Sequence, residues 1–251
     1  MKVKFLGTGT SHGIPMLSCD CAVCSSSNPK DKRYRCSVLL EQDDKRIVID
    51  TGYEFRLQLV RENIKHIDAV LYTHSHSDHI AGFDDLRVFC RYKEFPIYCS
   101  KYVLDYLKQA HPYAFCSYKG GPKLAVTVIE SFTHYNIEGF DILAVEVRHT
   151  KDVDLKTMAF RIGSLGYITD CTYMSDEAIE AFKGIDTLIV GALHKLPSNA
   201  HFSFEEAYLL SKKLGAKDVY FTHINHNTSY DEINTLYPNA KSAYDGLELN
   251  I

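Results

Sequence analysis

Four metal-ligating side chains lie within six residues of the sequence, in the run VLYTHSHSDHIAG. They are His74, His76, Asp78 and His79, and they follow a short apolar stretch typical of a buried strand. Alternation along an extended chain places His74 and His76 on one side, and the next turn brings Asp78 and His79 to the same region. Imidazole suits divalent transition metals and a carboxylate adds a hard anionic ligand, so the pattern predicts a metal site.

A second group of ligand types is the run CDCAVC, with Cys19, Cys21 and Cys24. It is open to three interpretations: a disulfide, a catalytic nucleophile, or three ligands of a metal. We find no signal peptide or long apolar segment in the sequence and expect a cytoplasmic protein, in which thiols stay reduced. Cys19 and Cys21 are also only one residue apart, which is poor geometry for a bond between them. The other cysteines are expected to be buried as small hydrophobic residues, and they are Cys36, Cys90, Cys99, Cys116 and Cys171.

The composition predicts one globular domain, residues 1–251, that positions these groups. The chain has 251 residues, of which 45% are hydrophobic, so a full core is expected. With 28 basic and 32 acidic residues, the net charge of −4 argues against a broad nucleic-acid-binding surface. Strand-like runs come first, and strands mixed with helices follow. This order predicts two sheets packed face to face with helices outside.

Ten runs rich in β-branched and aromatic residues are predicted as strands: Val3–Leu6, Val38–Glu41, Arg46–Ile49, Ala69–Tyr72, Ala125–Ile129, Ile142–Val147, Thr157–Ile162, Tyr167–Thr169, Thr187–Val190 and Val219–Thr222. Helical periodicity predicts four helices: Phe55–Glu62, Tyr102–Lys108, Ser175–Phe182 and Phe204–Leu214. Ser175 and Ser203 are predicted N-caps, and Glu206 would complete a capping box with Ser203.

The HxHxDH pattern after a strand resembles the first metal-binding segment of the metallo-β-lactamase superfamily. The resemblance extends over nearly the whole chain, from GTGT at 7–10 and IDTG at 49–52 to YFTHINH at 220–226. It implies an α/β (α+β) fold, the four-layer αββα sandwich of that superfamily. It also implies two catalytic divalent metals, zinc or manganese with iron as an alternative, which would activate a hydroxide.

The ligands that the resemblance implies each lie at the end of a β-rich run: His74, His76 and His149 for one metal, Asp78, His79 and His223 for the other, and Asp170 as the bridge. His134 is the alternative to His149 as the third histidine ligand. We prefer His149 because it closes a clear strand and precedes the segment that carries Asp170.

His226 follows His223 by three residues and can point to another part of the rim. With Cys19, Cys21 and Cys24 it would complete a tetrahedral Cys₃His zinc site, which is closed to substrate and therefore structural. The CxCxxC pattern with the later HxxH resembles one subgroup, the cyclic-phosphate phosphodiesterase of the phosphonate-degradation pathway. Three free thiols in a serine-rich loop are the alternative.

The segment HFSFEEA resembles the one that donates a general-acid histidine in the superfamily, so His201 is predicted to protonate the leaving group. His194 is expected to help bind the phosphate, with an exposed loop histidine as an equal alternative. The predicted catalytic residues are therefore His201, Asp78 and His194. Asp50 is predicted to orient a ligand histidine. Residues considered for contacts to substrate are His12, Arg56 and Arg87, although for the arginines we favour structural ion pairs.

Asp170 and the lack of a signal peptide favour phosphodiester hydrolysis over β-lactam hydrolysis, and HxH in place of HxE disfavours the redox branch. We therefore expect a metal-dependent hydrolase of the phosphoric diester class that acts on a small phosphodiester, with a cyclic ribose phosphate as first candidate. The alternatives are a tRNA 3′-end type endonuclease and a non-catalytic binding scaffold. Residues 96–124 are the only candidate for an RNA-binding arm, so a nucleic-acid partner is disfavoured. No membrane partner is expected, and a homodimer stays open.

Overall fold

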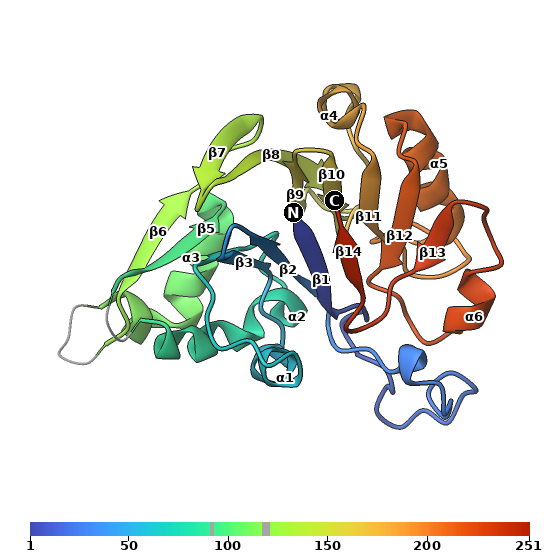
Figure 1. The fold of residues 1–251 in the computed structure, drawn as a ribbon, viewed down its shortest axis with the longest axis horizontal. Helices are drawn as coiled ribbons and strands as arrows, with labels where there is room; N and C mark the ends of the chain where they lie inside the picture. The colour runs from blue at the N-terminus through green and yellow to red at the C-terminus, as the bar shows by residue number, and fades with distance from the viewer. Residues whose placement is uncertain (91–92, 117–120) are drawn as a thin grey trace.

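The computed structural model describes residues 1–90, 93–116 and 121–251. Two seven-stranded sheets pack face to face in this part of the chain, and helices cover their outer faces (Figure 1). This is the predicted four-layer αββα arrangement, so the predicted fold class is confirmed.

The first sheet has the order β14-β1-β2-β3-β4-β5-β6. Its strands are β1 (Lys2–Gly7), β2 (Ser37–Gln42), β3 (Lys45–Ile49), β4 (Ala69–Leu71), β5 (Phe95–Cys99), β6 (Leu124–Val128) and β14 (Glu248–Asn250). The second sheet has the order β13-β12-β11-β10-β9-β8-β7. Its strands are β7 (Thr133–Ile137), β8 (Phe140–Arg148), β9 (Lys156–Ile162), β10 (Leu165–Ile168), β11 (Thr187–Gly191), β12 (Asp218–Thr222) and β13 (Ala240–Ser242).

Strand directions explain why distant segments meet at one edge. In the first sheet β3, β4, β5 and β6 run parallel to one another. In the second sheet β10, β11, β12 and β13 are parallel, and β8 runs the same way because it and β10 are both antiparallel to β9. Loops that leave the carboxyl ends of β4, β8, β10 and β12 therefore converge, and such loops commonly carry function.

The helices are α1 (Phe55–Arg61), α2 (Ser77–Ile80), α3 (Lys101–Ala110), α4 (Asp176–Phe182), α5 (Phe204–Leu214) and α6 (Tyr230–Ile233), with 3₁₀ turns η1 (Pro29–Asp31), η2 (Ala81–Val88) and η3 (Pro112–Phe115). Both predicted caps are confirmed. Ser175 accepts from the N–H of Ala178, and Ser203 forms the predicted reciprocal box with Glu206. Among the helices of the described ranges, none is long and apolar enough to cross a membrane.

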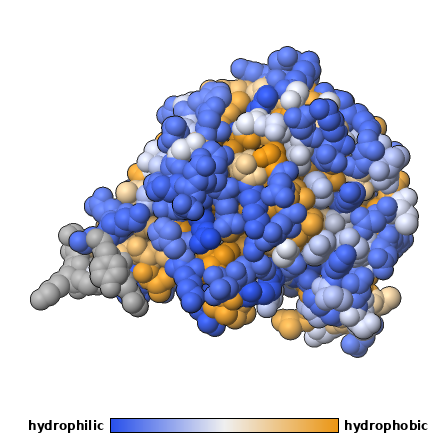
Figure 2. Space-filling model, viewed as in Figure 1, coloured by the Kyte–Doolittle hydropathy of each residue, from blue (hydrophilic) through white to orange (hydrophobic). Residues whose placement is uncertain are grey.

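Three apolar layers hold the sandwich together. Phe5 and Ile47 from the first sheet meet Phe160 and Tyr167 from the second in the central layer. One outer layer packs α1, η2 and α3 on the first sheet, and the other packs α4 and α5 on the second. The face of the molecule in Figure 2 is mostly hydrophilic, with hydrophobic side chains in small separate areas.

All ten predicted strands and all four predicted helices are present, with ends that differ by at most two residues. The prediction missed β5, β7, β13, β14 and the one-turn helices α2 and α6. Cys116 is exposed at the end of η3, so its predicted burial was wrong, whereas the other four scattered cysteines are buried. The candidate arm, 96–124, contains α3, η3 and parts of β5 and β6, and its residues 117–120 lie outside the described part.

Candidate metal centre

The structure brings all seven residues of the implied ligand set together at the convergent edge. Two overlapping groups have ligand atoms within 4.8 Å of one another: His74, His76, His149 and Asp170 in one group, and Asp78, His79, Asp170 and His223 in the other. The rival His134 lies on β7, where its Nδ1 is 2.9 Å from the carboxylate of Asp141, and it belongs to neither group.

Asp170 stands between the two groups and presents one oxygen to each. Its Oδ2 is 3.2 Å from Nε2 of His149 and 3.5 Å from Nε2 of His74. Its Oδ1 is 3.3 Å from Nε2 of His223 and 3.5 Å from Nε2 of His79. One carboxylate with an oxygen in each ligand group is the arrangement of a bridge between two cations.

Three residues at this edge have left-handed backbones, which non-glycine residues seldom adopt. They are Asp50, Asp170 and His223, with φ of 64°, 44° and 55°. Each follows the end of a strand, and the left-handed turn keeps its side chain beside the cluster instead of continuing the strand. Such conformations cost free energy and persist where the surroundings enforce them, often at functional sites.

Buried histidine nitrogens without a hydrogen-bond partner indicate whether the cluster could bind metal ions. Nε2 of His74 and of His79 is buried and makes no hydrogen bond within the part of the chain that the structure describes. Leaving a buried polar atom unpaired costs about 1–3 kcal/mol. Both atoms face the carboxylate of Asp170, where a divalent cation would satisfy nitrogen and oxygen together. The residues present therefore fit two metal ions.

The charges of the cluster also fit the binding of metal ions. Burial opposes charge on His79, but the surrounding carboxylates, led by Asp170, raise its pKa well above the usual value. Burial also opposes charge on Asp170, yet the imidazoles of His223 and His79 hold its pKa well below the usual range. Asp170 thus stays anionic and draws protons onto His79 and His149, whose pKa values it raises. Metal ions would replace those protons, because a histidine ligand binds in its neutral form.

A chain of hydrogen bonds fixes the ring orientations behind the ligands. Asp50 is fully buried and accepts from Nδ1 of His79 at 2.7 Å and from the Thr73 hydroxyl at 2.8 Å. The Thr73 oxygen in turn accepts from Nδ1 of His74 at 2.9 Å. Each Nδ1 is thereby a donor, which leaves each Nε2 with a lone pair for a metal. The structure places Asp50 where the sequence predicted it.

Sequence reasoning missed two threonines that belong to this network. Thr73 links Asp50 to His74, and the Thr169 hydroxyl donates to Oδ1 of Asp170 at 2.7 Å. The signal was present in the sequence, because threonine directly precedes three of the seven ligands, in YTH, ITD and FTH. The third threonine, Thr222, is fully buried and contacts the sulfur of Cys36 at 3.3 Å.

The cysteine loop and His226 form a separate cluster. Nδ1 of His226 lies 3.2 Å from the sulfur of Cys19, 3.4 Å from that of Cys21 and 3.6 Å from that of Cys24. The backbone N–H of Cys24 is the largest influence that lowers the pKa of Cys21 to about 6, so this residue is a thiolate at neutral pH. All four ligand atoms lie within 4.8 Å of one another, as a zinc site requires.

This second cluster joins two loops that are far apart in sequence. In Figure 1 the loop that carries the cysteines lies beside α6, at the C-terminal half of the chain. Thr10 donates its backbone N–H to the carbonyl of Ile224 at 3.0 Å, two residues before His226. The same short segment carries His223, so the cysteine cluster anchors the loop of a metal-centre residue.

The two predicted catalytic histidines, His201 and His194, have different surroundings in the structure. His201 stacks on His223 with ring centroids 4.7 Å apart, and its Nδ1 lies 3.8 Å from Asp170. Burial lowers the pKa of His201 to about 3, so its ring is neutral in the free protein. His194 is half-buried, and its Nδ1 accepts from the backbone N–H of Leu196 at 3.2 Å. Within the described residues we find no contact that joins His194 to the metal centre.

The candidate substrate contacts lie outside the cluster. His12 is exposed on the loop after β1, and Arg56 is exposed on α1. Arg87 lies 3.7 Å from Asp84 in an exposed pair and covers the ring of Tyr113. The structural role favoured for Arg87 matches these contacts.

Comparison with known proteins decides the family. The model of the family described as β-lactamase superfamily domain matches residues 45–224, most of the chain. The chain belongs to the metallo-β-lactamase superfamily. A crystal structure of a diphosphatase from the PhnP family is 35% identical, with a TM-score of 0.92 over 100% of this chain and 97% of the other. This likeness agrees with the subgroup that the sequence predicted.

Two other comparisons say less about the function of this chain. Zinc-bound PqqB from Methylobacterium extorquens is 18% identical with a TM-score of 0.79, over the whole of both chains, which shows a shared fold. A protein named octanoyltransferase from Porphyromonas gingivalis is 32% identical over 99% of this chain and 51% of its own length. The chain thus spans about half of that relative.

Proposed function

We propose that this superfamily hydrolase cleaves the phosphodiester of a small molecule with two divalent metals at the Asp170 centre. The observation that carries the proposal is the Asp170 carboxylate, with one oxygen toward each of two ligand groups. Two divalent cations would exceed the charge of the two carboxylates among the ligands by two. The resulting positive centre suits an anionic phosphodiester and the charge that develops as it is cleaved.

The residues of the two groups would hold the cations, zinc or manganese with iron as an alternative. When bound, such a pair polarises phosphoryl oxygens and supplies a water that ionises near neutral pH. The protein holds Asp170 anionic and fixes the rings of His74 and His79 through Asp50 and Thr73. Preorganised ligands of this kind do not have to reorganise during the reaction.

We assign protonation of the leaving oxygen to the imidazole of His201. The ring lies at the edge of the cluster, stacked on His223 and 5.1 Å from His149 between ring centroids. Its pKa of about 3 in the free protein results mainly from burial, which disfavours the charged ring. An anionic phosphodiester beside the ring would favour the charged form and raise that pKa. Substrate binding would therefore prepare His201 as the acid.

His201→Ala is expected to lower kcat for an alkyl phosphodiester about 100-fold, within the usual range for a positioned acid. Hydrolysis of bis-p-nitrophenyl phosphate should fall only a few-fold, because nitrophenolate leaves without a proton. Steady-state kinetics with both esters measures the difference, and metal analysis checks that the variant keeps its metals. His134→Ala, an exposed histidine on β7, is the matched control. Equal losses on both esters would remove His201 from this role.

A panel of substrates tests the proposed function itself. It includes bis-p-nitrophenyl phosphate, ribose cyclic phosphates, 2′,3′-cyclic nucleotides and precursor tRNA, each given to metal-loaded protein. We expect turnover of the small diesters and none of the precursor tRNA. Turnover of precursor tRNA alone would instead support the endonuclease alternative, and turnover of none would contradict the proposal.

We also propose that Cys19, Cys21, Cys24 and His226 bind a structural zinc. A thiolate at Cys21 and three sulfurs around one imidazole nitrogen support it. The site has four protein ligands and so leaves no position for substrate.

A further inference from the structure

The short turn 198–201, of sequence SNAH, carries His201 and contacts the metal centre through its backbone. The carbonyl of Ala200 accepts from Nδ1 of His149 at 2.9 Å. With its proton on Nδ1, His149 keeps the lone pair of Nε2 for a metal. The next residue of the turn, His201, stacks on His223. Two adjacent residues of one turn thus serve a metal ligand and the proposed acid.

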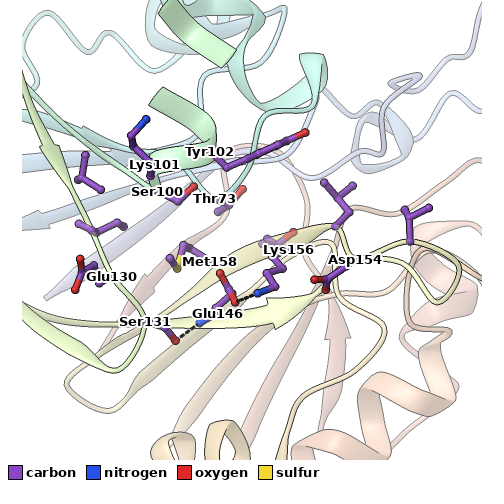
Figure 3. Close-up of a pocket in the computed structure, with 15 residues that line it drawn as sticks. Thr73, Ser100, Lys101, Tyr102, Glu130, Ser131, Glu146, Asp154, Lys156 and Met158 are labelled. Carbon is purple, nitrogen blue, oxygen red and sulfur yellow. Dashed lines mark hydrogen bonds and ion pairs between the residues drawn. The ribbon is translucent and has the colours of Figure 1, made fainter. Parts of the chain in front are cut away.

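The loop that follows His149 contacts this turn directly. Lys151 donates its backbone N–H to the carbonyl of Asn199 at 2.8 Å, and the side-chain amide of Asn199 donates to Asp152 at 3.1 Å. Further along, residues 153–155 line a pocket of about 680 Å³ (Figure 3), which none of the seven ligand residues lines. The part of the loop next to His149 is therefore tied to the turn, whereas its later residues line the pocket.

One side chain holds the turn itself. The hydroxyl oxygen of Ser198 accepts from the backbone N–H of Ala200 and from that of His201, each at 3.1 Å. Serine hydroxyls commonly stabilise turns by such bonds to nearby backbone groups. Phe202, the residue after the turn, donates its N–H to the carbonyl of Cys171 at 2.9 Å. Three successive N–H groups are thus paired, and the Ser198 hydroxyl supplies two of these bonds.

These two bonds matter because burial contributes little to the turn. Ser198 and Ala200 are half-buried and Asn199 is exposed, and none of the three belongs to an apolar cluster of the described residues. The net contribution of one hydrogen bond corresponds to roughly 2–10-fold in an equilibrium. Loss of both bonds should therefore lower the population of this turn about 10-fold relative to other conformations.

We propose that Ser198 is a positioning residue that acts through the turn 198–201. Its hydroxyl keeps the Ala200 carbonyl on the ring of His149, and it keeps the imidazole of His201 at the edge of the metal centre. Ser198 itself belongs to neither ligand group. The inference rests on the proposed function for the task of His201, and it goes further in assigning support of the metal ligand and of the acid to one serine.

Two esters with different leaving groups test the effect on His201. At saturating metal, Ser198→Ala should lower kcat for an alkyl phosphodiester about 10-fold, the loss expected for the turn, and kcat for bis-p-nitrophenyl phosphate less than 3-fold. Ser198→Thr keeps the hydroxyl and should keep both rates. In His201→Ala, the added change Ser198→Ala should leave the ratio of the two rates as it is, because the positioned group is gone. An unchanged ratio in Ser198→Ala alone, with both esters turned over, would contradict positioning of His201.

Zinc affinity tests the effect on His149 without any turnover. It is measured by competition with a chromogenic chelator in the His226→Ala background, which removes a ligand of the cysteine cluster. Loss of direct support behind a ligand typically costs 10–100-fold in affinity, and Ser198 acts one step further away, so Ser198→Ala should weaken zinc binding about 5-fold. Ser198→Thr should bind zinc as tightly as its parent. Equal affinity in Ser198→Ala and its parent, or no zinc bound by either, would overturn the link to His149.

Ser175→Ala is the matched control, because the Ser175 hydroxyl also accepts from a backbone N–H, that of Ala178 at the start of α4. Its loss should lower Tm but change neither the ratio of rates nor zinc affinity. Losses in Ser175→Ala equal to those in Ser198→Ala would reduce both to lower stability and overturn the inference. If the unaltered protein turns over no diester, the proposed function fails, and zinc affinity still decides whether Ser198 supports His149.

Discussion

Asp170→Asn is expected to lower kcat/KM for a phosphodiester about 1,000-fold or more, with loss of both metals at the catalytic centre. Loss of a residue that only orients a ligand typically costs 10–100-fold in metal affinity or activity, so loss of a shared anionic ligand should cost more. The substitution keeps the size of the side chain but removes the charge that both ligand groups face. It also replaces one of the oxygens that face the ligand groups with an amide N–H₂, which cannot bind a cation.

Metal content by elemental analysis and activity on bis-p-nitrophenyl phosphate measure this effect in the same sample. The cysteine-bound zinc should remain, because that cluster shares no residue with the catalytic one. Asp186→Asn is the matched control, since this aspartate is half-exposed and pairs with Lys217 at the surface. An Asp170→Asn protein that keeps all its metals and its turnover would show that Asp170 is not the bridge.

His226→Ala is expected to remove one zinc and lower Tm by about 10 °C, a shift of the size that a loss of several kcal/mol produces in a chain of this length. Zinc affinity at such a site contributes to folding free energy, because the unfolded chain does not hold the ligands together. The loss of folding free energy should be much smaller than the full free energy of zinc binding, since three apolar layers also stabilise this chain. Turnover should persist in the folded fraction.

His223→Ala, three residues away, is expected to give the opposite result: no turnover, with the cysteine-bound zinc kept. Cys21→Ala should match His226→Ala, and Cys116→Ala, an exposed cysteine outside the cluster, should resemble the unaltered protein. Thermal unfolding and zinc content are measured for all four variants. A sharp difference between Cys21→Ala and His226→Ala, or a native disulfide between Cys19 and Cys24, would refute the structural zinc.

The clustering of the candidate ligands was predictable because each of their segments follows a strand with a strong local signal. The segments before His74, His149, Asp170 and His223 are buried on both faces or alternate clearly, and those strands are present. The missed strands lack such a signal. β5 contains Pro96, which usually argues against a strand, and β13 and β14 have three residues each. Their positions are decided by neighbouring strands.

The pocket and the role of His194 were beyond sequence reasoning for a related reason. Lining residues of the pocket range from Thr73 to Met158 and share no spacing, so only the folded chain brings them together. His194 and His201 lie in one loop and are equally conspicuous in the sequence. The fold turns His201 onto His223, whereas His194 accepts a hydrogen bond from its own loop.

The most direct test of the two-metal account is a titration of chelator-treated protein with zinc or manganese. Bound metal per chain and the rate on bis-p-nitrophenyl phosphate are measured at each step, with His226→Ala titrated in parallel to remove the structural site. We expect activity in His226→Ala to rise to its maximum only as the second equivalent binds. Full activity with one equivalent or with none would contradict a centre in which Asp170 joins two metal ions.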